Sequence, residues 1–294
     1  LGYNAGGSVT TGVQNTFVGA LTGDSLTDAD SNIAIGYASL TADTLGSKSV
    51  AIGAGTLESQ NFSTATDSYN VAIGHTAGGS ITTGVENVLV GGLVGDALTT
   101  GLRNVAMGHT ALTTDTKGEA SVGVGYGALY SQNFTTSTSV HNVGVGYHAG
   151  VNITTGVQNV LIGGLAGDAL TDADGNIAIG YAALSGDTLG SKSTAIGEGA
   201  LAVQNFTTAT DTYNTAVGFQ AGVAITTGLS NTLIGGVAGD AFTDADHNTA
   251  IGNESLTADT LGSKSTAIGS LALATQNFTT ATDSYNTAVG FETG

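Results

Sequence analysis

The strongest constraint on the fold is a five-residue pattern that returns along the whole chain. The pattern is Asn or Ser, then two residues, then Ile, Val or Met, and finally Gly, as in Asn176–Gly180. Successive final glycines, here called ruler glycines, lie 17, 17, 17 and then 21 residues apart, so a larger unit has 17 + 17 + 17 + 21 = 72 residues. A fixed short period with one strand-like segment is typical of a solenoid. The sequence therefore predicts an all-β, parallel β-solenoid. The ruler glycines are Gly2, Gly19, Gly36, Gly53, Gly74, Gly91, Gly108, Gly125, Gly146, Gly163, Gly180, Gly197, Gly218, Gly235, Gly252, Gly269 and Gly290.

The repeat also predicts the domain organisation. One continuous solenoid is expected over residues 1–294, with super-repeats at about 3–74, 75–146, 147–218 and 219–290 and a partial coil at 291–294. Neither terminal coil carries a polar capping unit, which an isolated solenoid needs, so the chain is expected to be a segment of a longer fibre. In the 21-residue coil, the four extra residues should form a loop that recurs along one edge.

Composition excludes several partners. The formal net charge is −18, from 23 acidic and five basic residues, so the chain should repel nucleic acids and anionic membranes. No run of about 18 apolar residues occurs, so no membrane insertion is expected in this segment. Cysteine and proline are absent, and the 47 glycines show no collagen-like period, which assigns them to tight turns.

Alternation around the ruler glycine predicts a short strand. β-Branched residues such as Ile177 and Ile179 share one face, and small residues such as Ala178 occupy the other. The pattern does not decide which face is interior, but the β-branched face is treated as core, so Ile179→Asp is expected to be far more damaging than Asp187→Asn.

Other positions are assigned to corners and to a second strand. The Asn or Ser four residues before each ruler glycine is interpreted as a corner ladder in which side-chain amides bond between coils, with Asn able to adopt the left-handed region. A second short strand is expected around leucines such as Leu40, Leu184 and Leu201. Apolar residues including Leu45, Phe62, Ile81 and Leu170 are expected to fill the remaining corners.

The motifs resemble two families of fibrous proteins. Asn32–Leu40 and Ser49–Gly55 are similar to the head repeats of trimeric autotransporter adhesins, and Asn214–Gly218 and Asn286–Gly290 resemble repeats of bacteriophage tail fibres. The resemblance covers the whole chain and implies a left-handed β-roll that assembles as a homotrimer in an adhesive or receptor-binding fibre. The adhesin repeats have shorter coils, and the phage repeats match the 17-residue spacing better. The resemblance therefore leaves the choice between a virion and a bacterial cell surface open.

A recurring acidic corner is the only candidate metal site. Hard cations such as Ca²⁺ favour clusters of carboxylate oxygens, but no bidentate Glu or flanking helix completes a calcium loop here, and solvated turns are the favoured interpretation. The candidate ligands are Asp168, Asp172, Asp174, Asp240, Asp244 and Asp246, and Asp24, Asp28 and Asp30 recur at the same corner.

Histidines, lysines and aromatic residues form three further sets of candidates. His75 and His109 lie two coils apart, roughly 10 Å, which is too far for one metal ion. Lysines recur once per super-repeat and are interpreted as surface ion pairs, which contribute little to stability. Aromatic residues of the 21-residue coil either fill its wider corner or stack on sugars; the first is favoured for Phe, and Tyr is left undecided. The lysines are Lys48, Lys117, Lys192 and Lys264, and the aromatic residues are Phe62, Phe134, Phe206, Phe278, Tyr69, Tyr213 and Tyr285.

These observations favour a non-enzymatic, extracellular structural or adhesive fibre. Its expected partners are further copies of the chain, in a homotrimer or filament, and a surface glycan or receptor. A single-chain solenoid filament is the main alternative. An ice-binding solenoid is disfavoured because threonine pairs such as Thr82-Thr83 occur once per super-repeat, and a polysaccharide-degrading solenoid lacks paired carboxylates.

Overall fold

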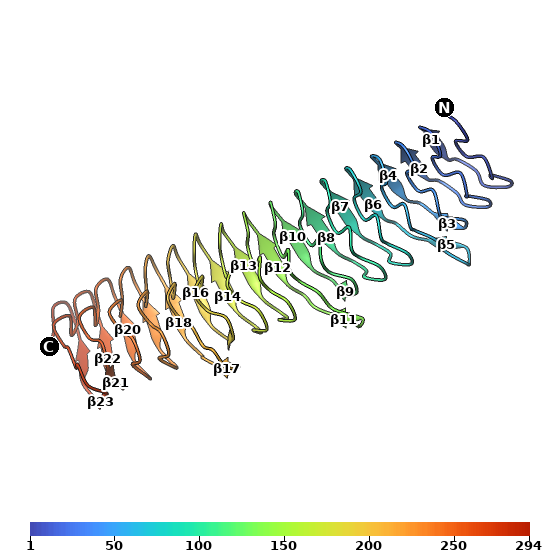
Figure 1. Cartoon of the computed structure of the whole chain (residues 1–294). Coiled ribbons are helices and arrows are strands. Elements are labelled where there is room, and N and C mark those ends of the chain that lie inside the picture. Colours follow the sequence, from blue (N-terminus) through green and yellow to red (C-terminus); the bar gives the residue numbers. More distant parts are fainter. The chain divides into compact units, whose positions relative to one another are not determined.

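The computed structural model describes residues 1–294, which form strands and turns but no helix. The chain divides into two compact units, residues 1–142 and 143–294. Each unit is a parallel β-solenoid, as the spacing predicts, and a three-residue ruler strand precedes each ruler glycine from Gly19 onward (Figure 1).

The ruler strands of each unit pair in register. Residues opposite one another occupy equivalent places in successive coils, for example Ile177 beside Thr194 and Ile179 beside Ile196. In residues 1–142 the strands are β1 (Thr16–Val18), β2 (Ile33–Ile35), β4 (Val50–Ile52), β6 (Val71–Ile73), β7 (Val88–Val90), β8 (Val105–Met107) and β10 (Val122–Val124). In residues 143–294 they are β12 (Val143–Val145), β13 (Val160–Ile162), β14 (Ile177–Ile179), β16 (Thr194–Ile196), β18 (Thr215–Val217), β19 (Thr232–Ile234), β20 (Thr249–Ile251), β22 (Thr266–Ile268) and β24 (Thr287–Val289).

The ruler glycine is required by backbone proximity between coils. Gly180 has φ of 134°, a region that residues with a Cβ rarely adopt. A Cβ on Gly180 would lie 2.6 Å from the carbonyl carbon and oxygen of Gly197 in the next coil. Any side chain here would therefore push two coils apart, which explains why this position is glycine in every coil.

The predicted second strand around the leucines is wrong. Leu40, Leu184 and Leu201 are buried, but they lie in turns with φ of 54°, 53° and 50°. The second strands are two-residue segments that join only the third and fourth coils of a super-repeat. The pairs are β3 (Gly46–Ser47) with β5 (Thr66–Asp67), β9 (Gly118–Glu119) with β11 (Thr138–Ser139), β15 (Gly190–Ser191) with β17 (Thr210–Asp211), and β21 (Gly262–Ser263) with β23 (Thr282–Asp283).

The small residue in the middle of each ruler strand faces the interior. Ala178 is fully buried, whereas Ile177 remains 37% exposed. Where the middle residue is larger, neighbouring glycines make room for it. A Cβ on Gly78 or Gly95 would lie 2.9 or 3.0 Å from the side chain of Leu89. The core is thus a narrow column. A large middle residue fits in it only where neighbouring positions are glycines without side chains.

The asparagines form a corner ladder, as predicted, but their main hydrogen-bond partners differ from the predicted ones. Asn32 Nδ2 donates to the carbonyl of Gly46 at 2.9 Å, and Asn32 Oδ1 accepts from the backbone N–H of Ser49 at 2.8 Å. The side chain therefore bonds mainly to the backbone of the next coil. The left-handed conformation belongs to the residue before it, such as Ser31 with φ of 60°.

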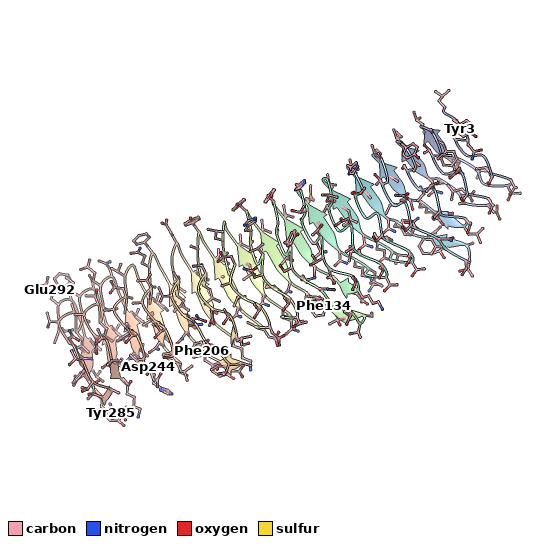
Figure 2. The ribbon with its side chains drawn as sticks, in the orientation of Figure 1. Tyr3, Phe134, Phe206, Asp244, Tyr285 and Glu292 are labelled. Carbon is pink, nitrogen blue, oxygen red and sulfur yellow. The ribbon has the colours of Figure 1, made fainter.

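The phenylalanines fill the wider corner of the 21-residue coil, as predicted. Phe62, Phe134 and Phe206 are 5 to 7% exposed, whereas Phe278, in the last such coil, is half-buried. The tyrosine at the end of the same loop lies outside, as Tyr285 shows at the margin of its coil (Figure 2). Of the other predicted corner residues, Ile81 and Leu170 are fully buried, whereas Leu45 is half-buried.

Candidate functional surfaces

A buried polar cluster links the third and fourth coils of every super-repeat. Asp187 is fully buried, and its Oδ1 accepts hydrogen bonds from the backbone N–H groups of Gly190 and Phe206, both at 3.0 Å. Its Oδ2 accepts from Gln204 Nε2 at 2.5 Å. The same Nε2 donates to Ser193 Oγ at 2.8 Å. Gln204 therefore occupies the space that an asparagine fills elsewhere, which explains the serine at this coil type.

Every partner of this carboxylate is a neutral donor inside the coil, so the cluster is structural. It recurs around Asp43, Asp115 and Asp259. The sequence interpretation of Asp187 and Ile179 is wrong, because Asp187 is the buried residue and Ile179 is half-exposed. An aspartate flanked by Gly and Thr has the composition of a surface turn, and only the matching Gln one coil later signals the buried cluster.

The acidic corner uses its carboxylates as hydrogen-bond acceptors. Asp172 accepts from Thr155 Oγ1 at 2.6 Å, and Asp174 accepts from the backbone N–H of Val157 at 2.8 Å. The same bonds recur at Asp244 from Thr227, at 2.6 Å, and at Asp246 from the N–H of Leu229, at 2.7 Å. The structure brings no three carboxylate or imidazole groups into an arrangement that could hold a metal ion. The calcium hypothesis therefore gains no geometric support.

Asp168 differs from its equivalents at the same corner. Asp240 accepts a hydrogen bond from Thr257 Oγ1 at 2.5 Å, and Asp24 and Asp96 likewise accept from Thr41 and Thr113 in the next coil. The next coil above Asp168 carries Ser185, whose hydroxyl donates to the carbonyl of Ala202 instead. Asp168 Oδ1 is buried with no hydrogen-bond partner, and burial raises the pKa of this carboxyl.

Three of the predicted surface ion pairs form identical clusters with a tyrosine. Lys192 Nζ lies 2.5 Å from Asp211 Oδ2 and 5.3 Å from the ring centroid of Tyr213. The hydrogen bond to Asp211 raises the pKa of Lys192 and lowers that of Asp211. Equivalent clusters join Lys48 to Asp67 and Tyr69, and Lys264 to Asp283 and Tyr285.

Lys117 does not occupy the same position as the other three lysines, so the prediction of a column of four equivalent lysines is wrong. It occupies the position of Leu45, because 117 − 72 = 45, and the position equivalent to Lys48 holds Ala120. The partners change with it, since Ser139 and His141 replace the aspartate and the tyrosine. The three residues are thus exchanged together, as expected for side chains that depend on one another.

The outer face of the ruler sheet is apolar and half-exposed in residues 1–142. Each strand directs its first and third side chains outward, such as Ile33, Ile73 and Met107, which are 38, 37 and 43% exposed. Neighbouring strands repeat these side chains in register, which produces two adjoining columns of Val, Ile and Met.

In residues 143–294 one outer column changes from β-branched apolar residues to threonine. Six successive strands begin with Thr, and the register places these side chains directly beside one another. Thr-Thr pairs such as Thr82-Thr83 do not reveal this column, whereas the first residue of each ruler triplet is the sequence signal for it. The column comprises Thr194, Thr215, Thr232, Thr249, Thr266 and Thr287.

Comparison with known proteins assigns no family. No protein-family model matches the chain, and no curated protein or solved structure matches it. The chain has no helix with the length and apolar character needed to cross a bilayer.

Proposed function

We propose that the chain is part of a non-enzymatic structural fibre that extends from a virion or a bacterial cell surface and serves in attachment. The proposal rests on the apolar outer face of the ruler sheet. A sheet face that exposes columns of Ile, Val and Met is a candidate for contact with further copies of the chain. The motif resemblance supports three copies around one axis, as a homotrimer. A solenoid suits a fibre because coils can be added without changing the contacts of those already present.

The test is the assembly state of the chain in solution. The wild type is expected to have the mass of three 28.7 kDa chains by light scattering. Carboxylates at Ile73 and Met107 should block the contact, because they would be desolvated between chains. The double variant Ile73→Glu/Met107→Glu should therefore be smaller while keeping the β-type circular dichroism of the wild type.

The matched control is Thr135→Glu, which adds a carboxylate at an exposed position of a 21-residue coil. It should assemble like the wild type. A wild-type chain that remains a folded monomer at micromolar concentration would overturn the assembly proposal and favour a single-chain filament.

The threonine column supports a second candidate, an ice-binding surface. Its hydroxyl and methyl groups repeat at about 4.8 Å on a rigid sheet, which is the kind of regular array that can order water. Ice recrystallisation assays would test this function. Wild-type inhibition that is lost in Thr232→Tyr and retained in Val88→Tyr would support it, and an inactive wild type would exclude it.

A further inference from the structure

Aromatic side chains follow most alternate ruler glycines. Asn253 interrupts this column, and Tyr126 adds a ring on one of the intervening coils. In residues 143–294, Tyr147, Tyr181 and Phe219 are 56, 59 and 52% exposed. The coils between them carry Gly164 and Glu198 at the same place. In residues 1–142 the corresponding alternate coils carry Tyr3, Tyr37, His75 and His109, and Tyr3 is labelled in Figure 2. Tyr126 lies on the coil after His109, and the two rings stack with their centroids 5.6 Å apart.

The backbone keeps these residues in one line. The N–H of Leu165 donates to the carbonyl of Tyr147 at 2.9 Å, and the N–H of Ala182 donates to that of Gly164 at 3.0 Å. The same bond runs from Gly199 to Tyr181 at 3.0 Å. With one strand spacing of about 4.8 Å per coil, successive aromatic rings are roughly 10 Å apart.

At two places a glycine on the intervening coil makes room for a ring. A Cβ on Gly164 would lie 3.5 Å from Cδ2 of Tyr181, so this ring leans over the glycine of the preceding coil. His109 has the same relation to Gly92, also at 3.5 Å. These two rings thus extend over the preceding coil, with the backbone of its glycine beneath them.

A half-exposed ring of this kind offers an apolar face and, in tyrosine, a hydrogen-bonding hydroxyl. Sugar rings present complementary apolar faces. The residue after the ring is polar at two places: the His148 ring stacks on Tyr147 with centroids 4.1 Å apart, and Gln220 follows Phe219 in the chain. Regular spacing selects a ligand that is itself periodic. The ring spacing of roughly 10 Å is close to two sugar units of an extended β-linked chain. The net charge of −18 disfavours anionic polysaccharides.

We propose that this aromatic column binds an extended neutral β-linked polysaccharide, with one ring for every two sugar units. The inference rests on the proposed attachment function and names its ligand class. Another copy of the chain has the same two-coil period, but the Ile, Val and Met columns of the ruler sheet give such a copy a larger apolar contact. Because rings act together on one polymer, affinity should rise steeply with the number of sugar units.

The test uses microcrystalline cellulose and cello-oligosaccharides as probes, with heparin as the anionic control. The wild type should sediment with cellulose, bind cellohexaose more tightly than cellobiose, and leave heparin unbound. The triple variant Tyr147→Ala/Tyr181→Ala/Phe219→Ala should lose at least about tenfold in affinity for the polymer, because multivalent binding is lost with its sites.

Two controls separate ring stacking from other causes. Tyr213→Ala removes a tyrosine of similar exposure, 56%, outside the column, and should bind cellulose like the wild type. The conservative variant Tyr181→Phe keeps the ring and should also bind. Equal melting temperatures of the wild type and the triple variant would exclude unfolding as the cause of lost binding.

Three results would overturn the inference: a wild type that ignores cellulose, a triple variant that binds it unchanged, or a triple variant whose assembly mass falls. The last result would assign the column to a contact between copies. Light scattering of the same samples tests the proposed assembly independently. An absence of cellulose binding would therefore leave the assembly proposal intact.

Discussion

In ruler strands such as β14 the small side chain faces the interior and the larger apolar side chains face outward, which is the reverse of the usual arrangement. Ala178 points inward and is fully buried, whereas Ile177 on the same strand is 37% exposed. In most half-buried strands the larger apolar residue faces the core. Here the interior beside buried turn leucines such as Leu184 is narrow, and a larger inward residue such as Leu89 fits only where neighbouring glycines make room. The comparison teaches that in a thin solenoid the available volume, more than hydrophobicity, decides which residue is interior.

The sharpest test of this comparison places the same charge on both faces of one strand. Ala178→Asp should unfold the coil, because an unpaired carboxylate in the interior costs several kcal/mol and disturbs both neighbouring coils. Ile179→Asp should cost much less, since the outer side chain is already half-exposed to water. Thermal denaturation measures the loss of stability in each variant. Equal melting temperatures would show that the two faces are not distinct.

The second test compares a buried and an exposed aspartate. Asp187→Ala should destabilise the protein by about 3 kcal/mol, because the donors of Gly190, Phe206 and Gln204 lose their acceptor inside the coil. Asp211→Ala removes an acceptor that is 46% exposed and should have a much smaller effect. Urea titrations measure both, and a comparable loss in the two variants would contradict the assignment of Asp187 to the core.

A third, smaller effect is expected at the half-buried acidic corner. Ser185→Thr should restore to Asp168 the hydroxyl partner that Thr257 provides to Asp240, with a gain of about 1 kcal/mol at neutral pH. Because burial raises the pKa of Asp168, the charged carboxylate destabilises the folded protein above that pKa. The gain should therefore be full at neutral pH and shrink as the pH falls towards 3.8, the ordinary value of the carboxyl.

Melting curves of both proteins between neutral and acidic pH measure this difference. The matched control is Thr257→Ser, which should weaken the partner of Asp240 and lower stability. A gain in Ser185→Thr that is independent of pH would mean that the new hydroxyl does not act on Asp168.

The smallest effect is expected at the exposed lysine clusters. Lys192→Ala should lower the melting temperature only slightly, and the difference should decrease in high salt, which screens exposed charges. The lowered pKa of Asp211 keeps its contribution present above the ordinary value of 3.8 and removes it as the pH falls through the lowered value. The raised pKa of Lys192 keeps its contribution below 10.5 and removes it as the pH rises through the raised value. Salt-independent destabilisation would instead indicate lost packing over Tyr213.

Much of the fold could be predicted from the sequence because the ruler glycine is a backbone requirement. A side chain at Gly180 meets the next coil at 2.6 Å, so coil length and strand position are visible as glycine spacing. The interior face was not predictable in this way, since period-two alternation is symmetrical between faces. The turn at Leu40 was also missed, because leucine seldom adopts positive φ and only burial by neighbouring coils holds it there.

The candidate surfaces were less predictable than the coils. The threonine column and the aromatic column depend on which residues of successive coils become neighbours, and this requires the register of pairing. The buried Asp187 depends on a glutamine 17 residues away. Composition near each residue does not contain these relations, whereas comparison of equivalent positions between super-repeats does.

The buried Asp–Gln cluster has a consequence for how a gene of this kind can change length. Loss or duplication of 72 residues returns every aspartate to a coil that precedes its glutamine, so recombination between super-repeats should yield foldable products. Loss of a single 17-residue coil can preserve the glycine spacing and still place Asp187 beside a coil without Gln204. Inherited length variants should therefore differ by whole groups of four coils, and the smallest heritable step should be the super-repeat.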